Sequence, residues 1–95
     1  GGEVGDPAIN RERVRRLEAL LRERVGAVRV EVSDESHLHA GHAGAQGGAG
    51  HFRAHVVSPR FAGLSRLEVQ RLVYQALDEM IGPEIHALAL RCEAP

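Results

Sequence analysis

Three histidines lie close together in a segment that is otherwise poor in reactive side chains. His37, His39 and His42 fall within six residues, among glycines and alanines. Imidazole nitrogens bind iron, zinc, copper and nickel, and the small flanking residues let the backbone bend until such donors converge. Asp34 or Glu35, just before them, could orient a ligating imidazole through a hydrogen bond. The segment therefore indicates a metal site, and three solvent-exposed loop side chains are the alternative.

Few other residues suggest catalysis. Cys92 is the only cysteine, which excludes an internal disulfide and a metal site made of cysteines alone. It lies in an apolar run, where a small buried hydrophobic side chain is the simpler interpretation. His86, in the same run, is expected to be half-buried and hydrogen-bonded. Ser65 precedes a helical pattern and is interpreted as a helix cap. An enzyme needs a nucleophile with a base, or a metal with an open position, so we expect a non-enzymatic protein.

Size and charge limit the possible partners. Ninety-five residues make one domain with a mainly aliphatic core, because the chain has no Trp, one Tyr and two Phe. The net charge of −1 gives no overall attraction to phosphate. Glutamates at helical spacing separate six early arginines, which favours an ion-paired helix face over a nucleic-acid contact: Arg11, Arg13, Arg15, Arg16, Arg22 and Arg24. No stretch is long and apolar enough to cross a membrane.

The first half of the chain predicts a helix, a strand and a long loop. Asp6-Pro7 is a good helix start and Gly26 a stop. Between them apolar residues recur at helical spacing: Ile9, Val14, Leu17, Leu20, Leu21 and Val25. Residues 28–32 alternate apolar and polar side chains, as a half-buried strand does. Residues 33–50, rich in Gly, Ala and His, have no periodicity. Such a long loop in a small domain usually marks function or disorder.

The second half predicts a strand, a helix and a strand. Residues 52–57 alternate and end before Pro59, which places His51 and His55 on the solvent face with Arg53. Ser65 and Glu68 have the spacing of a capping box. The helix they begin would bury a stripe and end at Gly82-Pro83: Leu67, Leu72, Val73, Ala76, Leu77 and Met80. Residues 85–92 form an apolar run of strand length.

The predicted order is helix, strand, strand, helix, strand. Two helices packed on one face of a three-stranded sheet bury these stripes, which gives an α+β fold. The first two strands are expected to be antiparallel neighbours. Residues 1–6 are interpreted as a flexible linker or a trimmed end, and residues 7–95 as one domain.

Several short motifs occur in the order found in BolA-like proteins. They are Asp34-Glu35-Ser36 followed by His39, His51-Phe52-Arg53, Val56-Val57-Ser58, Phe61-Ala62-Gly63-Leu64-Ser65, Arg71-Leu72-Val73-Tyr74 and Ile85-His86-Ala87-Leu88-Ala89-Leu90. From residue 8 to residue 95 the chain resembles the BolA family. Its His-Ala-Gly-His loop further resembles the longer-loop members, including the BolA domains fused to SufE.

The resemblance implies a fold like the class II KH domain and pairing with a monothiol glutaredoxin. Such a pair can hold a bridging [2Fe–2S] cluster, with glutaredoxin cysteine and glutathione on one side and BolA side chains on the other. The loop ligand of the family carries over to His39, with His42 as the alternative, and His37 is expected to contact the partner or glutathione. SufE-type and other iron–sulfur assembly proteins are further partners that the resemblance suggests.

One position departs from the family pattern. The family's second ligand is a histidine in an Arg-His-Arg-x-Val-Tyr motif, and the aligned residue here is Gln70, preceded by Val69. A neutral amide is a poor ligand for iron. Cluster ligation is therefore expected to be weakened, or to rest on His39 and His42. Gln70 and Arg71 would then line the opposite side of the same groove, where Arg71 could bind a glutathione carboxylate or the partner.

Two other functions stay open from the sequence. The KH likeness suggests a DNA-binding transcriptional regulator. Gly41-His42-Ala43-Gly44 spells the nucleotide-gripping pattern of KH domains, but it lies between two strands, where that clamp does not form. The alternative metal function is zinc or copper binding by the three loop histidines alone. The resemblance implies the cytoplasm for a bacterial protein, and the mitochondrion or plastid for a eukaryotic one.

Overall fold

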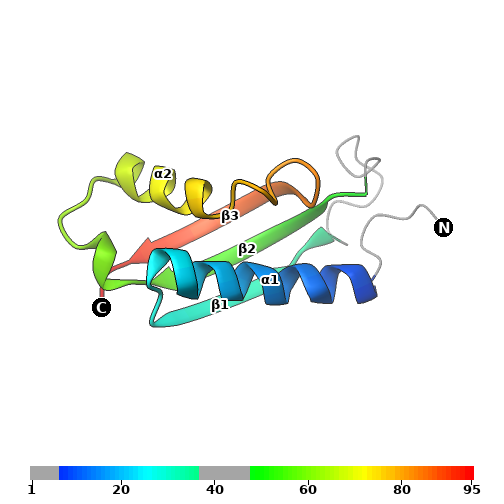
Figure 1. The fold of residues 1–95 in the computed structure, drawn as a ribbon, viewed down its shortest axis with the longest axis horizontal. Helices are drawn as coiled ribbons and strands as arrows, with labels where there is room; N and C mark the ends of the chain where they lie inside the picture. Colours follow the sequence, from blue (N-terminus) through cyan, green and yellow to red (C-terminus); the bar gives the residue numbers. More distant parts are fainter. Residues whose placement is uncertain (1–6, 37–47) are drawn as a thin grey trace.

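The predicted elements form in the predicted order (Figure 1). The computed structural model describes residues 7–36 and 48–95. These residues contain α1 (Pro7–Val25), β1 (Arg29–Asp34), β2 (Gly50–Val57), the short 3-10 helix η3 (Pro59–Phe61), α2 (Arg66–Ala76) and β3 (Ile85–Glu93). The α-β-β-α-β prediction is confirmed.

The three strands form one mixed sheet with β2 in the centre. β1 runs antiparallel to β2, with Val30 opposite Val56, as predicted. β3 runs parallel to β2, with Leu90 opposite Ala54, and the register shifts between Gly50 and His51. The parallel pairing follows from the connection, because η3 and α2 carry the chain back along the sheet before β3 begins. Both helices lie on the same face of the sheet (Figure 1). β3 pairs with β2 alone, so among the described residues no strand covers its other edge.

The core lies between this face and the two helices. On β2, Phe52, Ala54 and Val56 point inward at a period of two and are almost completely buried. α1 packs against them through residues at helical spacing: Leu17, Leu21 and Val25. Residues in α2 and just after it pack against them as well. These buried members are Val73, Ala76, Leu77 and Met80. Aliphatic packing without tryptophan therefore closes the domain, as the composition predicts.

Three apolar residues expected in the core are exposed. Ile9, Val28 and Leu67 expose 51%, 65% and 57% of their surfaces. Val28 precedes the strand, and Leu67 is about 200° around α2 from Val69, which packs on the core. In α1 it is Asn10, one position after Ile9, that occupies the buried stripe. The spacing alone could not distinguish these neighbouring faces.

The second helix begins as predicted but ends early. Ser65 Oγ accepts a hydrogen bond from the Glu68 amide at 3.1 Å, and Glu68 Oε1 accepts one from the Ser65 amide at 2.8 Å. The capping box is thus confirmed. The helix ends at Ala76 and not at Gly82-Pro83, because residues 77–80 form turns that put Leu77 and Met80 into the core. Neither described helix is long and apolar enough to cross a membrane.

Candidate functional site

Side chains of α1 anchor both ends of the segment that connects β1 to β2. At its first end, the Asn10 side-chain amide donates a hydrogen bond to Ser36 Oγ at 3.3 Å. At its second end, the Arg13 guanidinium donates to the Gly48 carbonyl at 2.8 Å and to Asn10 Oδ1 at 3.0 Å. Asn10 and Ser36 are 0% and 1% exposed, so water does not compete for these bonds. The helix therefore holds residues 36 and 48 at fixed positions.

Ser36 also joins the segment to the central strand. Its Oγ accepts a hydrogen bond from the His51 amide at 3.0 Å, and the Glu35 amide donates to the His51 carbonyl at 2.8 Å. Asp34 Oδ1 accepts from the Ser36 amide at 2.9 Å. Glu35 forms an ion pair with Arg53 at 3.1 Å. In the described residues, Asp34 and Glu35 thus stabilise the end of β1. Their expected role, to orient a loop histidine, involves residues outside that part.

Gly50 permits the close packing at this end of β2. A Cβ atom on Gly50 would lie 2.6 Å from ring carbons of Phe52 and 3.0 Å from Ser36 Oγ. Phe52 is 2% exposed and cannot move without disturbing the core. A glycine is therefore required here for steric reasons.

Two histidines meet at this anchored end. The His51 and His86 rings lie 5.1 Å apart between centroids, tilted by 50°. His51 is buried, with 7% of its surface exposed and the His86 ring beside it, so the prediction that it lies exposed on the solvent face with Arg53 is wrong. His86 is exposed, so its expected half-buried position is also wrong. The sequence prediction missed this pair; the signal was a histidine at the start of each of two strands that proved to be parallel neighbours.

The other predicted histidines divide into two groups. His37, His39 and His42 lie outside the described residues. His55 is partly buried further along β2, where Nδ1 lies 3.2 Å from Glu31 and Nε2 lies 2.5 Å from Glu93. Its two nitrogens are thus engaged by carboxylates of both neighbouring strands, and it takes no part in the His51–His86 pair.

The arrangement of helices and strands agrees with the comparison to known families. The family model described as BolA-like protein matches residues 21–95, which is most of the chain. The chain belongs to the BolA family. It is 42% identical to human BolA-like protein 1 over 95 residues, which are 99% of this chain and 66% of the human protein. It is 40% identical to the DNA-binding transcriptional regulator BolA of Escherichia coli over 75 residues, 79% of this chain and 69% of that protein.

A solved structure supports the same assignment. The BolA domain of SufE1 from Arabidopsis thaliana superimposes with a TM-score of 0.76 at 33% identity, covering 87% of this chain and 92% of that one. This chain spans only 23% to 59% of the length of several other curated relatives. The fold and family of this BolA chain are therefore shown, and the activity of a whole relative does not follow from them.

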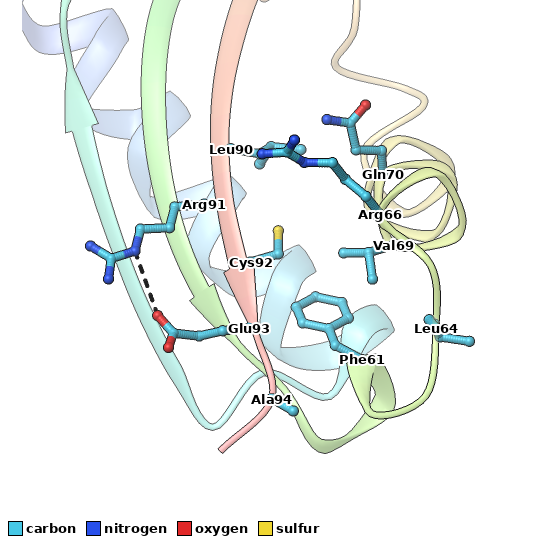
Figure 2. Close-up of a pocket in the computed structure, with 10 residues that line it drawn as sticks. All are labelled: Phe61, Leu64, Arg66, Val69, Gln70, Leu90, Arg91, Cys92, Glu93 and Ala94. Carbon is cyan, nitrogen blue, oxygen red and sulfur yellow. Dashed lines mark ion pairs between the residues drawn. The ribbon is translucent and has the colours of Figure 1, made fainter.

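The two helix residues predicted to face the histidines in this BolA chain lie on α2. Gln70 is exposed and lines a groove between α2 and the second half of β3, whose other lining residues include Leu90 and Cys92 (Figure 2). Arg71, also exposed, lies outside that lining. No histidine of the described part lines this groove.

Metal ligands are sparse in the part of this BolA chain that the structure describes. Residues 7–36 and 48–95 contain no group of three or more His, Cys, Asp or Glu side chains that could hold a metal. They offer one exposed imidazole, His86, beside the loop anchor. Cys92 is six residues further along β3, roughly 20 Å away at about 3.3 Å per residue. Burial raises the pKa of its thiol, which disfavours the thiolate that metals bind. The described residues therefore suit a metal group bound through an imidazole, whose other ligands come from outside this part of the chain.

Proposed function

We propose that this BolA-family chain is a non-enzymatic partner of a monothiol glutaredoxin and helps to carry a [2Fe–2S] cluster shared between the two proteins. The observation that supports this proposal most directly is the His51–His86 pair. It lies beside the ends of the segment that contains His37, His39 and His42, which α1 side chains anchor. Imidazoles replace two cysteine ligands in one known class of [2Fe–2S] centre, so histidine ligation of such a cluster is chemically sound. Cluster assembly, trafficking and redox regulation all fit this role.

The ligands we propose are His86 and one loop histidine, His39 or its alternative His42. His86 is favoured over His51 because its ring is exposed, whereas His51 is buried and its backbone is held by Ser36. This assignment removes the need for a histidine at Gln70. The partner would supply the remaining ligands as glutaredoxin cysteine and glutathione, and His37, Gln70 and Arg71 would contact the partner or glutathione. SufE-type assembly proteins are further candidate partners, since the similar Arabidopsis domain belongs to SufE1.

Anaerobic reconstitution tests the proposal. The protein is mixed with a monothiol glutaredoxin, glutathione, iron and sulfide, and the visible circular dichroism spectrum is compared with that of glutaredoxin alone. We expect a distinct spectrum for the pair, lost in His86→Ala and in His39→Ala or His42→Ala. The matched control is His55→Ala, a histidine of the same sheet outside the pair, which should retain the spectrum.

Three results would contradict the assignment. An unchanged spectrum in His86→Ala would remove that ligand. A spectrum gained only in Gln70→His would mean that the chain as written binds its partner without holding the cluster. A calorimetric titration showing tight zinc or copper binding to the protein alone, abolished in the loop variants, would instead favour an independent metal function.

DNA binding is the second candidate, because the similar Escherichia coli protein is named a DNA-binding transcriptional regulator. We rank it second because four α1 arginines are engaged within the molecule. Arg15 pairs with Glu12, Arg16 with Glu84 and Arg24 with Glu79, while Arg13 holds Gly48. Duplex affinity that falls steeply between about 50 and 200 mM salt, unaffected by His86→Ala, would reverse this ranking.

A further inference from the structure

No strand of the described residues pairs with the outer edge of β3 along its second half. The Ser58 amide donates to the Glu93 carbonyl at 3.1 Å, so the backbone groups of Glu93 face β2. The Tyr74 hydroxyl, on α2, donates to the Leu88 carbonyl at 3.3 Å, so the groups of Leu88 face outward. Because the direction alternates along a strand, the amides and carbonyls of Leu90 and Cys92 also face outward.

The outward groups of Leu90 and Cys92 have no hydrogen-bond partner in the described part of the chain, whereas the Leu88 carbonyl accepts from Tyr74. They border the groove of about 360 Å³ that separates β3 from the first turns of α2 (Figure 2). An edge with free amides and carbonyls is a template for pairing with another extended backbone. The groove is therefore suited to a strand-like ligand.

The walls of the groove favour an apolar side chain. Phe61, Val69, Leu90 and Cys92 line it, and the Cys92 sulfur points into the space between β3 and α2 (Figure 2). Because burial raises the pKa of this thiol, the wall stays uncharged near neutral pH. Phe61 is 5% exposed, so it offers no free ring on which a nucleic-acid base could stack.

The charge at the mouth of the groove favours an acidic ligand. Arg66 reaches from α2 toward β3 near Leu90 (Figure 2), and it makes no ion pair with the described residues. Arg91 also lines the groove but pairs with Glu93 at 3.6 Å, on the other side of β3 from α2 (Figure 2). Arg66 is thus the groove cation left without a carboxylate in the described part.

We propose that this groove binds an extended, acidic segment of a partner protein, which adds a strand to the outer edge of β3. Its backbone pairs with Leu90 and Cys92, an apolar side chain enters between Phe61 and Val69, and a carboxylate meets Arg66. The site needs neither iron nor the loop histidines, and it shares only Gln70, which also lines the groove, with the glutaredoxin or glutathione contact proposed above. It would give a partner a second point of attachment about 13 Å or more along β3 from His86.

The probe is a blocked hexapeptide, Ser-Val-Ser-Glu-Ser-Val, whose valine and glutamate side chains lie on one face of the extended chain. It is titrated into ¹⁵N-labelled protein and followed by amide chemical shifts. No glutaredoxin, glutathione or iron is present, so failure of this test and failure of the cluster proposal are distinguishable. We expect the largest shifts at the Leu90 and Cys92 amides. The same peptide with lysine for glutamate should bind more weakly, and the peptide N-methylated at alternate residues should not bind, because it cannot pair with the edge.

Matched variants separate the contribution of the Arg66 charge from that of the backbone hydrogen bonds of β3. Arg66→Gln should weaken binding by about three-fold, the size of one exposed ion pair, whereas Arg22→Gln, an exposed α1 arginine outside the groove, should not. Cys92→Pro removes one outward amide where an edge strand tolerates proline, and should abolish binding that Cys92→Ala retains.

The proposal is overturned by any of four results. The first is the absence of shifts at Leu90 and Cys92. The second is equal binding of the N-methylated peptide. The third is a peptide-free, concentration-dependent dimer in sedimentation that protects these amides, which would identify a second copy as the occupant. The fourth is tighter binding of an oligothymidylate at the same amides, which would assign the groove to single-stranded nucleic acid.

Discussion

The two ends of β3 differ in how fully their backbone groups are used. At the first end, the Ile85 amide donates to Met80 and its carbonyl accepts from Gly82, both at 2.9 Å, while the Gly50 amide donates to Glu84 at 2.9 Å. Ile85 itself is 1% exposed. At the second end, the outward groups of Leu90 and Cys92 have no partner among the residues that the structure describes, and their side chains are only partly buried.

This difference separates two kinds of recognition in one strand. The closed end holds His86 beside His51 on a rigid base, and fixed donors are what a metal site requires. The open end leaves backbone groups that a partner can complete, at the cost of an edge exposed to unwanted pairing. A partner that used both ends would bind the cluster and the strand together, so each contact would strengthen the other.

The largest expected effect on stability comes from shortening one side chain at each end of β3 in turn. Ile85→Ala should lower the free energy of unfolding by about 2–5 kcal/mol, because it leaves a cavity in a fully buried site. Leu90→Ala removes a side chain that packs on the rim of the core and should cost less than half as much. Urea denaturation followed by circular dichroism measures both. Equal losses would show that the two ends of β3 are packed alike.

Much of the fold was predictable because it depends on local patterns. The capping box at Ser65 and Glu68 and the period of two in residues 52–56 are properties of neighbouring residues, and both are confirmed. The errors arose where one turn of a helix offers several faces. Leu67 and Ile9 are apolar, yet the core uses Val69 and Asn10. Only the packing of helix on sheet selects between such neighbours.

The site was less predictable because it depends on long-range contacts. His51 and His86 are 35 positions apart, and their pairing requires β2 and β3 to be parallel with a shifted register. Asn10 and Arg13 reach Ser36 and Gly48 across the loop, although an asparagine within an apolar helical stripe was a usable signal. The open edge of β3 likewise follows from strand order and not from any motif.

One side-chain oxygen, Ser36 Oγ, connects α1 to the start of β2, and a single substitution removes it. Ser36→Ala removes the hydroxyl that accepts hydrogen bonds from Asn10 and the His51 amide, and should cost about 1–3 kcal/mol of stability because Asn10 is fully buried. Ser33→Ala, an exposed serine on β1, is the control and should change stability by less than about 0.5 kcal/mol. Hydrogen exchange at the His51 amide should also accelerate in Ser36→Ala. If exchange is unchanged, the serine does not hold the base of the loop.

The smallest expected effect concerns the second end of β3, where Glu93 contacts His55 of β2. A hydrogen bond from His55, helped by Arg91, lowers the pKa of the Glu93 carboxyl below its usual value of 4.5. The folded state therefore releases this proton more readily than the unfolded state. The stabilisation is fully present above the unfolded pKa and is lost as pH falls through the folded pKa. Glu93→Gln should thus be slightly less stable than the wild type at pH 6, and this difference should shrink at successively lower pH values below 4.5. Urea denaturation at these pH values measures the difference, with Glu23→Gln on the exposed face of α1 as the control. A difference that stayed constant down to the lowest pH would mean that the carboxylate charge does not join the two strands at this end.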